Sequence, residues 1–320
     1  MNVNMRFVLQ VIFLYSIFPL SAQTTNSSQL DFEKAVGIHN KGEYKEALKQ
    51  FDKLFFAGFS DPDIFRYRGF AKFKLNDFQG AAEDLDKVRA DQDPQVLGVL
   101  GICKYELGEL EAAKFFLINA TKAGFDNGKG HLYLGYLYLD GHQYVEALEQ
   151  LNKAENAGEK EMKLYEARGF AAFYASNLDL AISDLERVVK SGNDSLTFYE
   201  VLGLAYAGKN LFDKALPFLE KSDSLKSANS SVYFQLGNAY LERKLFTSAI
   251  EGYTKAISLN YNLPDVYLNR GKAKLAAGLT KESIADFDYL LKVNAEDIAA
   301  YRGRIEANLR LKDWPRIVTD

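Results

Sequence analysis

The side chains best suited to chemistry are three histidines and a single cysteine: His39, His131, His142 and Cys103. A zinc site needs His and Cys ligands at short fixed spacings, and a nucleophilic triad needs a histidine beside its nucleophile. The sequence contains no HExxH motif and no Cys/His ligand spacing. We therefore expect structural or solvated histidines, a buried and inert Cys103, no metal and no catalytic site.

Two other stretches resemble ligand-binding loops but lack essential residues. Segment 124–130 reads GFDNGKG. A phosphate-binding loop needs four residues between its first Gly and its Gly-Lys pair, and a Ser or Thr directly after the Lys; this segment has neither. The acidic run Asp84, Asp86, Asp91 and Asp93 lacks the glycine and the final glutamate of a calcium loop. We interpret segment 124–130 as a turn and expect no cofactor.

The composition is that of a globular protein. The 320 residues are 48% hydrophobic and 26% charged, and the formal net charge of -4 gives no basic face for nucleic acid. We therefore expect no nucleic-acid partner. A single cysteine also excludes a disulfide framework.

Residues 1–22 have the pattern of a secretory signal. Arg6 precedes the apolar run Phe7 to Leu20, and Ala22 ends a small-residue cleavage site. An apolar helix of about 14 residues rises about 21 Å, short of a bilayer core of about 30 Å. The alternative is a buried N-terminal helix. We expect an exported protein, periplasmic or secreted or peripheral to the outer membrane, with a polar leader at 23–30 and no membrane span after cleavage.

Small residues recur at a regular spacing along most of the chain. The first series is Ala35, Gly69, Gly101, Gly135, Gly169, Gly203, Gly237 and Gly271, with every step 34 residues except the 32 from Gly69 to Gly101. A second series lies twelve residues after the first: Ala47, Ala81, Ala113, Ala147, Ala181, Ala215, Ala249 and Ser283. A bulky residue follows four positions after each member of the second series. Such a period indicates a stack of similar two-helix units.

The pattern resembles the tetratricopeptide repeat family, a helix-turn-helix of about 34 residues with W-x2-L-G-x2-Y, then A-x3-F, then P. Its best match is Tyr233-x2-Leu236-Gly237-x2-Tyr240 followed by Ala249-x3-Tyr253. The closing proline is absent, and Pro62, Pro94 and Pro264 instead open repeats. The resemblance implies an all-α fold, a right-handed superhelical solenoid over 31–320. Its expected repeats are 28–61, 62–93, 94–127, 128–161, 162–195, 196–229, 230–263, 264–297 and a partial ninth at 298–320.

Close helix packing explains why the small residues recur. Two helices approach to about 8–10 Å only where the side chains at their crossing are small. We expect each Gly on the first helix of a repeat, helix A, to face the Ala on the second, helix B. The two missing residues before Pro94 predict a shortened helix end there, and Trp314 takes the bulky helix-B position of the partial repeat.

Arginines near the helix crossing have an aspartate sixteen residues later in four repeats. The pairs are Arg68 with Asp84, Arg168 with Asp184, Arg270 with Asp286 and Arg304 with Asp320. Because the positions face the hairpin interior, we expect structural ion pairs within each repeat. An acidic or basic ligand site is the alternative.

Helix A of such repeats lines a concave groove, and its groove positions are apolar in most repeats here. The candidate partner-binding residues are Phe70, Phe73, Ile102, Tyr105, Tyr136, Leu139, Phe170, Phe173, Tyr174 and Leu204. Contiguous exposed apolar surface marks a partner site. The alternative is that these aromatics pack against the adjacent helix A. If the groove binds a partner, rim charges at Arg66, Lys74, Glu166 and Glu200 would set specificity.

The family's best-known groove chemistry clamps a C-terminal carboxylate with Lys, Asn and Arg residues. Only Asn238 matches that set, and Phe234 stands where a Lys is needed. We therefore expect a non-catalytic scaffold that binds an extended or helical protein segment in an apolar groove, in an envelope complex. The alternative is the recognition arm of a longer enzyme or envelope-anchored protein whose other domain lies beyond residue 320. A stand-alone enzyme is the least favoured class.

Overall fold

The computed structural model describes residues 27–88 and 93–319. Every regular element in these ranges is a helix, so the predicted all-α class is confirmed. The chain forms two compact units, Met1–Glu159 and Lys160–Asp320, called unit 1 and unit 2 below. The expected signal segment lies outside the described residues. Residues 27–30, the last four of the expected polar leader, belong to the first helix, and the earlier ones lie outside the described residues.

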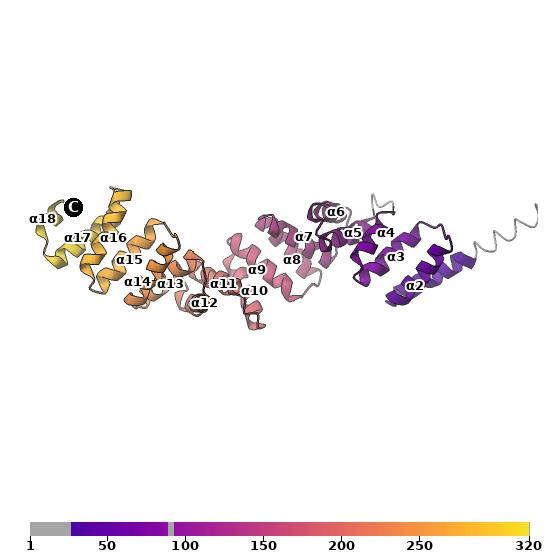
Figure 1. Cartoon of the computed structure of the whole chain (residues 1–320), viewed down its shortest axis with the longest axis horizontal. Coiled ribbons are helices and arrows are strands. Elements are labelled where there is room, and N and C mark those ends of the chain that lie inside the picture. The colour runs from indigo at the N-terminus through magenta and orange to yellow at the C-terminus, as the bar shows by residue number, and fades with distance from the viewer. Residues whose placement is uncertain (1–26, 89–92, 320) are drawn as a thin grey trace, which may run out of the picture. The chain divides into compact units, whose positions relative to one another are not determined.

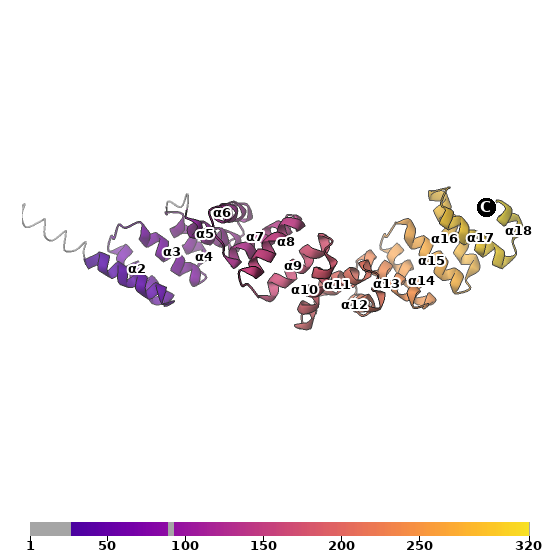
Figure 2. The same ribbon diagram turned by 180° about the vertical axis from the view of Figure 1, so that it is seen from behind.

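Unit 1 consists of antiparallel helix pairs. Its helices are residues 27–40, α2 (Tyr44–Phe56), α3 (Asp63–Lys74), α4 (Phe78–Leu85), α5 (Pro94–Glu106), α6 (Leu110–Lys122), α7 (Gly128–Asp140) and α8 (Tyr144–Asn156). Figures 1 and 2 show each helix lying beside the next one in the chain. The odd-numbered helices and the first helix are the helices A, and the even-numbered ones are the helices B.

Unit 2 continues the same alternation. Its helices are α9 (Met162–Tyr174), α10 (Leu178–Lys190), α11 (Leu196–Gly208), α12 (Phe212–Ser224), α13 (Ser230–Glu242), α14 (Phe246–Ser258), α15 (Pro264–Ala276), α16 (Thr280–Val293), α17 (Ile298–Leu311) and α18 (Trp314–Thr319). The last described helix A, α17, is followed by α18, which has six residues. The Trp314 side chain on α18 is mostly exposed.

The small residue on each helix A accommodates a large side chain from helix B. A Cβ added to Gly135 would lie 2.7 Å from Leu151 side-chain atoms, and one added to Gly237 would lie 2.6 Å from the Tyr253 ring. Leu151 and Tyr253 each stand sixteen residues after their glycine. The Ala expected at the crossing, twelve residues after Gly135, lies near it only through its more distant backbone oxygen. The glycine therefore makes room for the bulky residue rather than for a close Gly–Ala contact, because that side chain must enter the crossing to fill it.

The turn from helix A to helix B has a left-handed residue at one fixed position of every repeat. These residues, all with φ between 56° and 83°, are Gly42, Asn76, Gly108, His142, Ser176, Asn210, Lys244, Gly278 and Lys312. Left-handed backbone favours Gly and Asn, which occupy five of the nine positions. His142, singled out by its residue type, is thus one of the turn residues.

Helix α4 is much shorter than the other complete helices B. It has 8 residues, whereas α6 and α8 each have 13. This agrees with the shortened helix end predicted from the two-residue deficit. The Phe115 side chain on α6 is 62% exposed, and a cavity of about 780 Å³ lies between Leu85, Val88, Leu97 and Phe116.

The three complete Arg–Asp pairs lie inside their repeats. In unit 1, Arg68 Nε donates to Asp84 Oδ2 at 2.7 Å and Arg68 Nη2 donates to Oδ1 at 2.5 Å. In unit 2, Arg168 makes the same two bonds to Asp184 at 2.7 and 3.0 Å, and Arg270 Nη2 bonds Asp286 Oδ1 at 2.6 Å. The fourth predicted pair involves Asp320, which lies outside the described residues; Arg304 donates to Asp288 Oδ1 at 2.7 Å.

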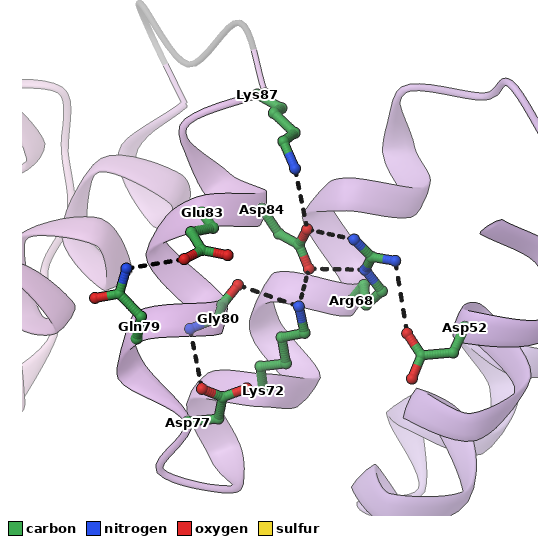
Figure 3. A network of polar contacts seen from close by, with 9 residues as sticks. All are labelled: Asp52, Arg68, Lys72, Asp77, Gln79, Gly80, Glu83, Asp84 and Lys87. Atoms are coloured by element: carbon green, nitrogen blue, oxygen red, sulfur yellow. Dashed lines mark hydrogen bonds and ion pairs between the residues drawn. The ribbon is translucent and has the colours of Figure 1, made fainter. Parts of the chain in front are cut away.

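A lysine one helical turn after the arginine joins two of these pairs. Lys72 Nζ lies 2.8 Å from Asp84 Oδ2, as Figure 3 shows, and Lys274 Nζ lies 2.7 Å from Asp286 Oδ2. Burial opposes ionisation of the Asp84 carboxyl, but the hydrogen bonds from Arg68 and Lys72 outweigh it, so the pKa of Asp84 lies below its ordinary value. These clusters are structural, since the carboxylate is fully enclosed.

Candidate interaction groove

A cavity of about 350 Å³ lies on the helix-A face of unit 1. Of the predicted groove residues, the structure brings Phe70, Phe73 and Ile102 together in its wall, and Val99 adds a further aliphatic side chain. These residues come from α3 and α5, which are consecutive helices A. The cavity is called the groove cavity below. Its full lining is His39, Phe70, Phe73, Lys74, Gln95, Val99, Ile102, Phe125, Asn127, Lys129 and Glu159.

Phe125 is a lining residue that the sequence analysis did not identify. It lies in the turn after α6, and its side chain is buried. Its ring packs against Gly98 on α5 and Gly130 on α7, where an added Cβ would lie 2.3 and 2.5 Å from Phe125 Cε1. Within segment 124–130, Gly130 therefore makes room for an aromatic ring. The signal for this contact was an apolar residue inside a glycine-rich turn.

The polar part of the lining carries three charged side chains. Lys74 ends α3, Lys129 lies in the first turn of α7, and Glu159 follows α8. Among the residues that the structure describes, none of these three side chains has an oppositely charged partner within 4.0 Å. Of the four predicted rim charges, Lys74 is the one that lines the groove cavity.

His39 completes the polar lining from the first helix. Its Nδ1 lies 3.4 Å from Asn40 Oδ1, while Nε2 is buried without a hydrogen-bond partner among the described residues. Burial lowers the pKa of His39. The hydrogen bond to Asn40 raises this pKa and the positive charge of Lys74 lowers it, and the net shift is downward. The imidazole is therefore neutral at pH 7.

Other predicted groove aromatics of unit 1 pack against one another. The ring of Tyr105 lies 4.9 Å from that of Tyr133 and 6.2 Å from that of Tyr136, measured between centroids. The Tyr133 hydroxyl donates to Glu106, and burial followed by this bond raises the pKa of Tyr133. The Leu139 side chain is half-buried. This cluster joins two consecutive helices A, α5 and α7.

The predicted groove residues of unit 2 differ in exposure. The Phe170 ring stacks on Phe198 of the next helix A at 5.3 Å and 22°. Phe173 contacts Tyr174 edge to face at 5.3 Å, and Tyr174 is 54% exposed. Leu204 is half-buried. Of the predicted groove aromatics in this unit, Tyr174 alone presents most of its side chain to solvent.

Several predicted specificity residues have structural partners instead. Glu166 accepts a hydrogen bond from Asn193 Nδ2 at 3.0 Å, and Glu200 accepts one from Ser227 Oγ at 2.5 Å. Arg66 pairs with Asp93 at 2.8 Å. These contacts tie helix A to a neighbouring turn.

The position that matches the carboxylate clamp is also occupied by internal contacts. Asn238 Oδ1 accepts hydrogen bonds from Tyr253 Oη at 2.8 Å and from Asn269 Nδ2 at 3.1 Å. Phe234 beside it is buried. The side chains at this place are thus arranged to join α13, α14 and α15.

The residues with chemical potential are held in unreactive settings. Burial raises the pKa of the Cys103 thiol to about 12, so it is not a thiolate at neutral pH. His131 is buried, with Nδ1 2.9 Å from Gln150 Oε1 and Nε2 3.2 Å from Asp126 Oδ1. Within residues 27–88 and 93–319, no three His, Cys, Asp or Glu side chains are grouped to hold a metal ion. Nor do those ranges contain a helix both long and apolar enough to cross a membrane.

Comparison with known families finds the repeat in unit 2. Residues 167–230 match a model described as tetratricopeptide repeat, and residues 237–278 match one described as TPR repeat. Both segments resemble tetratricopeptide repeats. The first segment contains the expected repeat 196–229, and the second contains Gly237, Tyr240, Ala249 and Tyr253 of the repeat that fits the sequence pattern best. No curated protein matches the chain.

Solved structures of tetratricopeptide repeat proteins are also similar to this chain. YrrB, described as a TPR protein with an unusual peptide-binding site, is 20% identical over 58% of this chain and 93% of its own, with a TM-score of 0.47. The C-terminal part of a protein from Cytophaga hutchinsonii is 19% identical over 75% and 98%, with a TM-score of 0.44. A protein from Parabacteroides merdae is 17% identical over 78% and 99%, with a TM-score of 0.42. Identities this low do not indicate which residues bind.

Proposed function

We propose that this chain is a non-catalytic tetratricopeptide-type scaffold whose groove cavity in unit 1 receives a side chain from a partner protein. The observation that carries the proposal is the cavity itself. A hollow of about 350 Å³ has room for one or two large side chains, and Phe70, Phe73 and Phe125 give it apolar walls. Buried aromatic contacts of this kind supply most of the binding free energy in interfaces.

The cavity also has the rigid support that a binding site needs. Its wall residues come from two adjacent helices A, and Phe125 is fixed between Gly98 and Gly130. A preformed pocket loses little conformational entropy on binding. An extended or helical segment would place one anchoring side chain in the cavity and continue along the helix-A face.

Site-specific photocrosslinking in the native host tests this proposal. Gln95 is exposed and lines the cavity, so a photoreactive amino acid at 95 should give one discrete adduct. The matched control is position 49, an exposed Lys on helix B α2. Val99→Phe fills the cavity and should abolish the adduct without lowering the melting temperature by more than a few degrees. If Val99→Phe disturbs folding, Gln95→Trp is the second variant, because it blocks the entrance of the cavity from the surface. The photoreactive amino acid is then placed at position 129 instead of 95.

Adducts of equal yield from position 49, or an adduct retained when the cavity is filled, would refute the groove cavity as the site. Mass spectrometry of the adduct identifies the crosslinked segment and shows whether a large apolar side chain lies at the attachment point.

We further propose that the protein is exported through its N-terminal 22 residues. The support is the sequence pattern of Arg6, the apolar run to Leu20 and the small residues ending at Ala22. The intact mass of the protein from its native host checks this, with Gln23 expected at the N-terminus. A mature protein that retains residues 1–22 would contradict export by cleavage.

A further inference from the structure

The polar rim of the groove cavity indicates which partner segments it accepts. We propose that the cavity selects an internal protein segment in which a bulky apolar residue stands next to an aspartate or glutamate. This inference rests on the proposed function and adds the chemistry of the partner. It follows from three rim features: two lysines without ion-pair partners, one glutamate, and a buried imidazole nitrogen.

The two rim lysines differ from two other lysines on the helices A of unit 1. Lys72 on α3 and Lys104 on α5 are each bound to carboxylates, at 2.8 Å from Asp84 and 3.0 Å from Glu109. Lys74 and Lys129 are exposed and have no such partner among the described residues. An ammonium group that the fold leaves without a counter-ion remains available for a carboxylate of the partner. Charges at an interface rim select partners and guide association.

Glu159 determines where that carboxylate would lie. Its side chain rests against the first residue of α7, where a Cβ added to Gly128 would lie 2.6 Å from Glu159 Cγ. This negative charge disfavours a second carboxylate at the α7 end of the cavity. The acidic residue of the partner therefore belongs at the end formed by Lys74, with its apolar neighbour against Phe125.

His39 favours a peptide over a small apolar acid. Asn40 Oδ1 can only accept a hydrogen bond, so the proton of the neutral imidazole is assigned to Nδ1. Nε2 is then a buried acceptor without a donor among the described residues. A backbone N–H of an entering segment supplies that donor, whereas a fatty acid has none. A satisfied acceptor removes the cost of leaving it unpaired.

A displayed peptide library tests the inference on the full-length chain. Random ten-residue peptides fused through their C-termini carry no free α-carboxylate, which separates internal recognition from clamping of a chain end. We expect selected sequences to contain Asp or Glu within two positions of Phe, Trp, Leu or Met. Selection on the Val99→Phe chain, run in parallel, should not enrich these sequences.

Each outcome of the selection decides between the two proposals. Enrichment of apolar peptides without acidic residues would overturn the inference and leave the apolar cavity as the site. Equal enrichment on wild type and Val99→Phe would overturn the proposed function as well. Enrichment of acidic-apolar pairs that Val99→Phe abolishes supports both.

Affinities of one selected peptide, synthesised with both ends blocked, measure the rim charges directly. Lys74→Glu should weaken binding about five- to tenfold at low salt, and Glu159→Gln should strengthen it about two- to threefold. Lys49→Glu on α2 makes the same charge change away from the cavity and should leave the affinity unchanged. Raising the salt concentration should shrink both rim effects. Equal affinities for all four proteins would overturn the charge-based selection.

Discussion

The ring of Phe125 lies against the backbone of Gly98 so closely that no other side chain fits between them. An added Cβ on Gly98 would stand 2.3 Å from Phe125 Cε1 and 2.4 Å from Cζ. The contact joins the turn after α6 to the middle of α5 and forms one wall of the groove cavity. The pair thus connects the stability of unit 1 to the shape of its candidate site.

Gly98→Ala should therefore destabilise unit 1 by about 1–3 kcal/mol, since overpacking displaces the ring or the helix. Urea unfolding followed by circular dichroism measures the effect. Phe125→Leu shortens the opposing side chain, so the double variant should lose less stability than the sum of the single variants. Strictly additive losses would show that the two residues do not press on each other.

Arg168→Ala should cost about 3–5 kcal/mol because it leaves the buried Asp184 carboxylate without its hydrogen-bond donor. Arg68→Ala is the matched comparison. Asp84 keeps Lys72 at 2.8 Å when Arg68 is removed, so that loss should be smaller. Thermal and urea unfolding of the two variants show which one loses more stability. Equal losses would mean that the lysine contributes nothing, and an unchanged melt for Arg168→Ala would exclude a stabilising pair.

The stabilisation from Asp84 should disappear in acid. Its pKa is held below its ordinary 3.8 in the folded state, so its contribution is complete above the unfolded-state value and is lost as the pH falls through the folded value. The stability difference between wild type and Asp84→Asn should be constant from pH 7 to about pH 5 and shrink below about pH 4. Urea midpoints across this range test the sign. A difference that grew on acidification would contradict it.

Tyr206 should give the opposite dependence at high pH. Burial, and then its hydrogen bond to Glu186, raises the pKa of Tyr206 to about 12, which means that folding favours the neutral phenol. Its contribution is complete below the ordinary value of 10 and is lost as the pH rises toward 12. Tyr206→Phe should lower the free energy of unfolding by about 1 kcal/mol at pH 7. Above pH 10 the stability of this variant should fall less steeply with pH than that of the wild type. Unfolding midpoints at pH 8 to 11 provide the measurement, with Tyr240→Phe, which loses the bond to Glu220, as a parallel case.

The period of small residues was sufficient to predict the helix pairs, because a helix crossing constrains residue size at each repeat. The Arg–Asp pairs were predictable for a similar reason, since both partners lie within one hairpin at a constant separation of sixteen residues. Lys72 was missed because its role depends on the helical turn that brings it beside Arg68.

The candidate site was less predictable than the fold. Phe70, Phe73 and Ile102 occupy groove positions of the repeat, but whether such residues line a cavity or pack on a neighbour depends on the adjacent helix. Phe170 is covered by Phe198, whereas Phe73 borders open space. Phe125 and Glu159 lie in turns, where a repeat pattern assigns no direction to the side chain.

The short helix α4 sets the order in which unit 1 comes apart. At about 1.5 Å per residue, its 8 residues extend about 12 Å, against about 20 Å for the 13 residues of α6. In a repeat array each hairpin is held by its own packing and by its neighbours, so a short helix leaves its hairpin with less packing to hold it. Amide hydrogens of α4 should accordingly exchange with solvent before those of α5 and α6. The hairpin of α3 and α4 would then open as one cooperative unit while the helices after Pro94 remain folded.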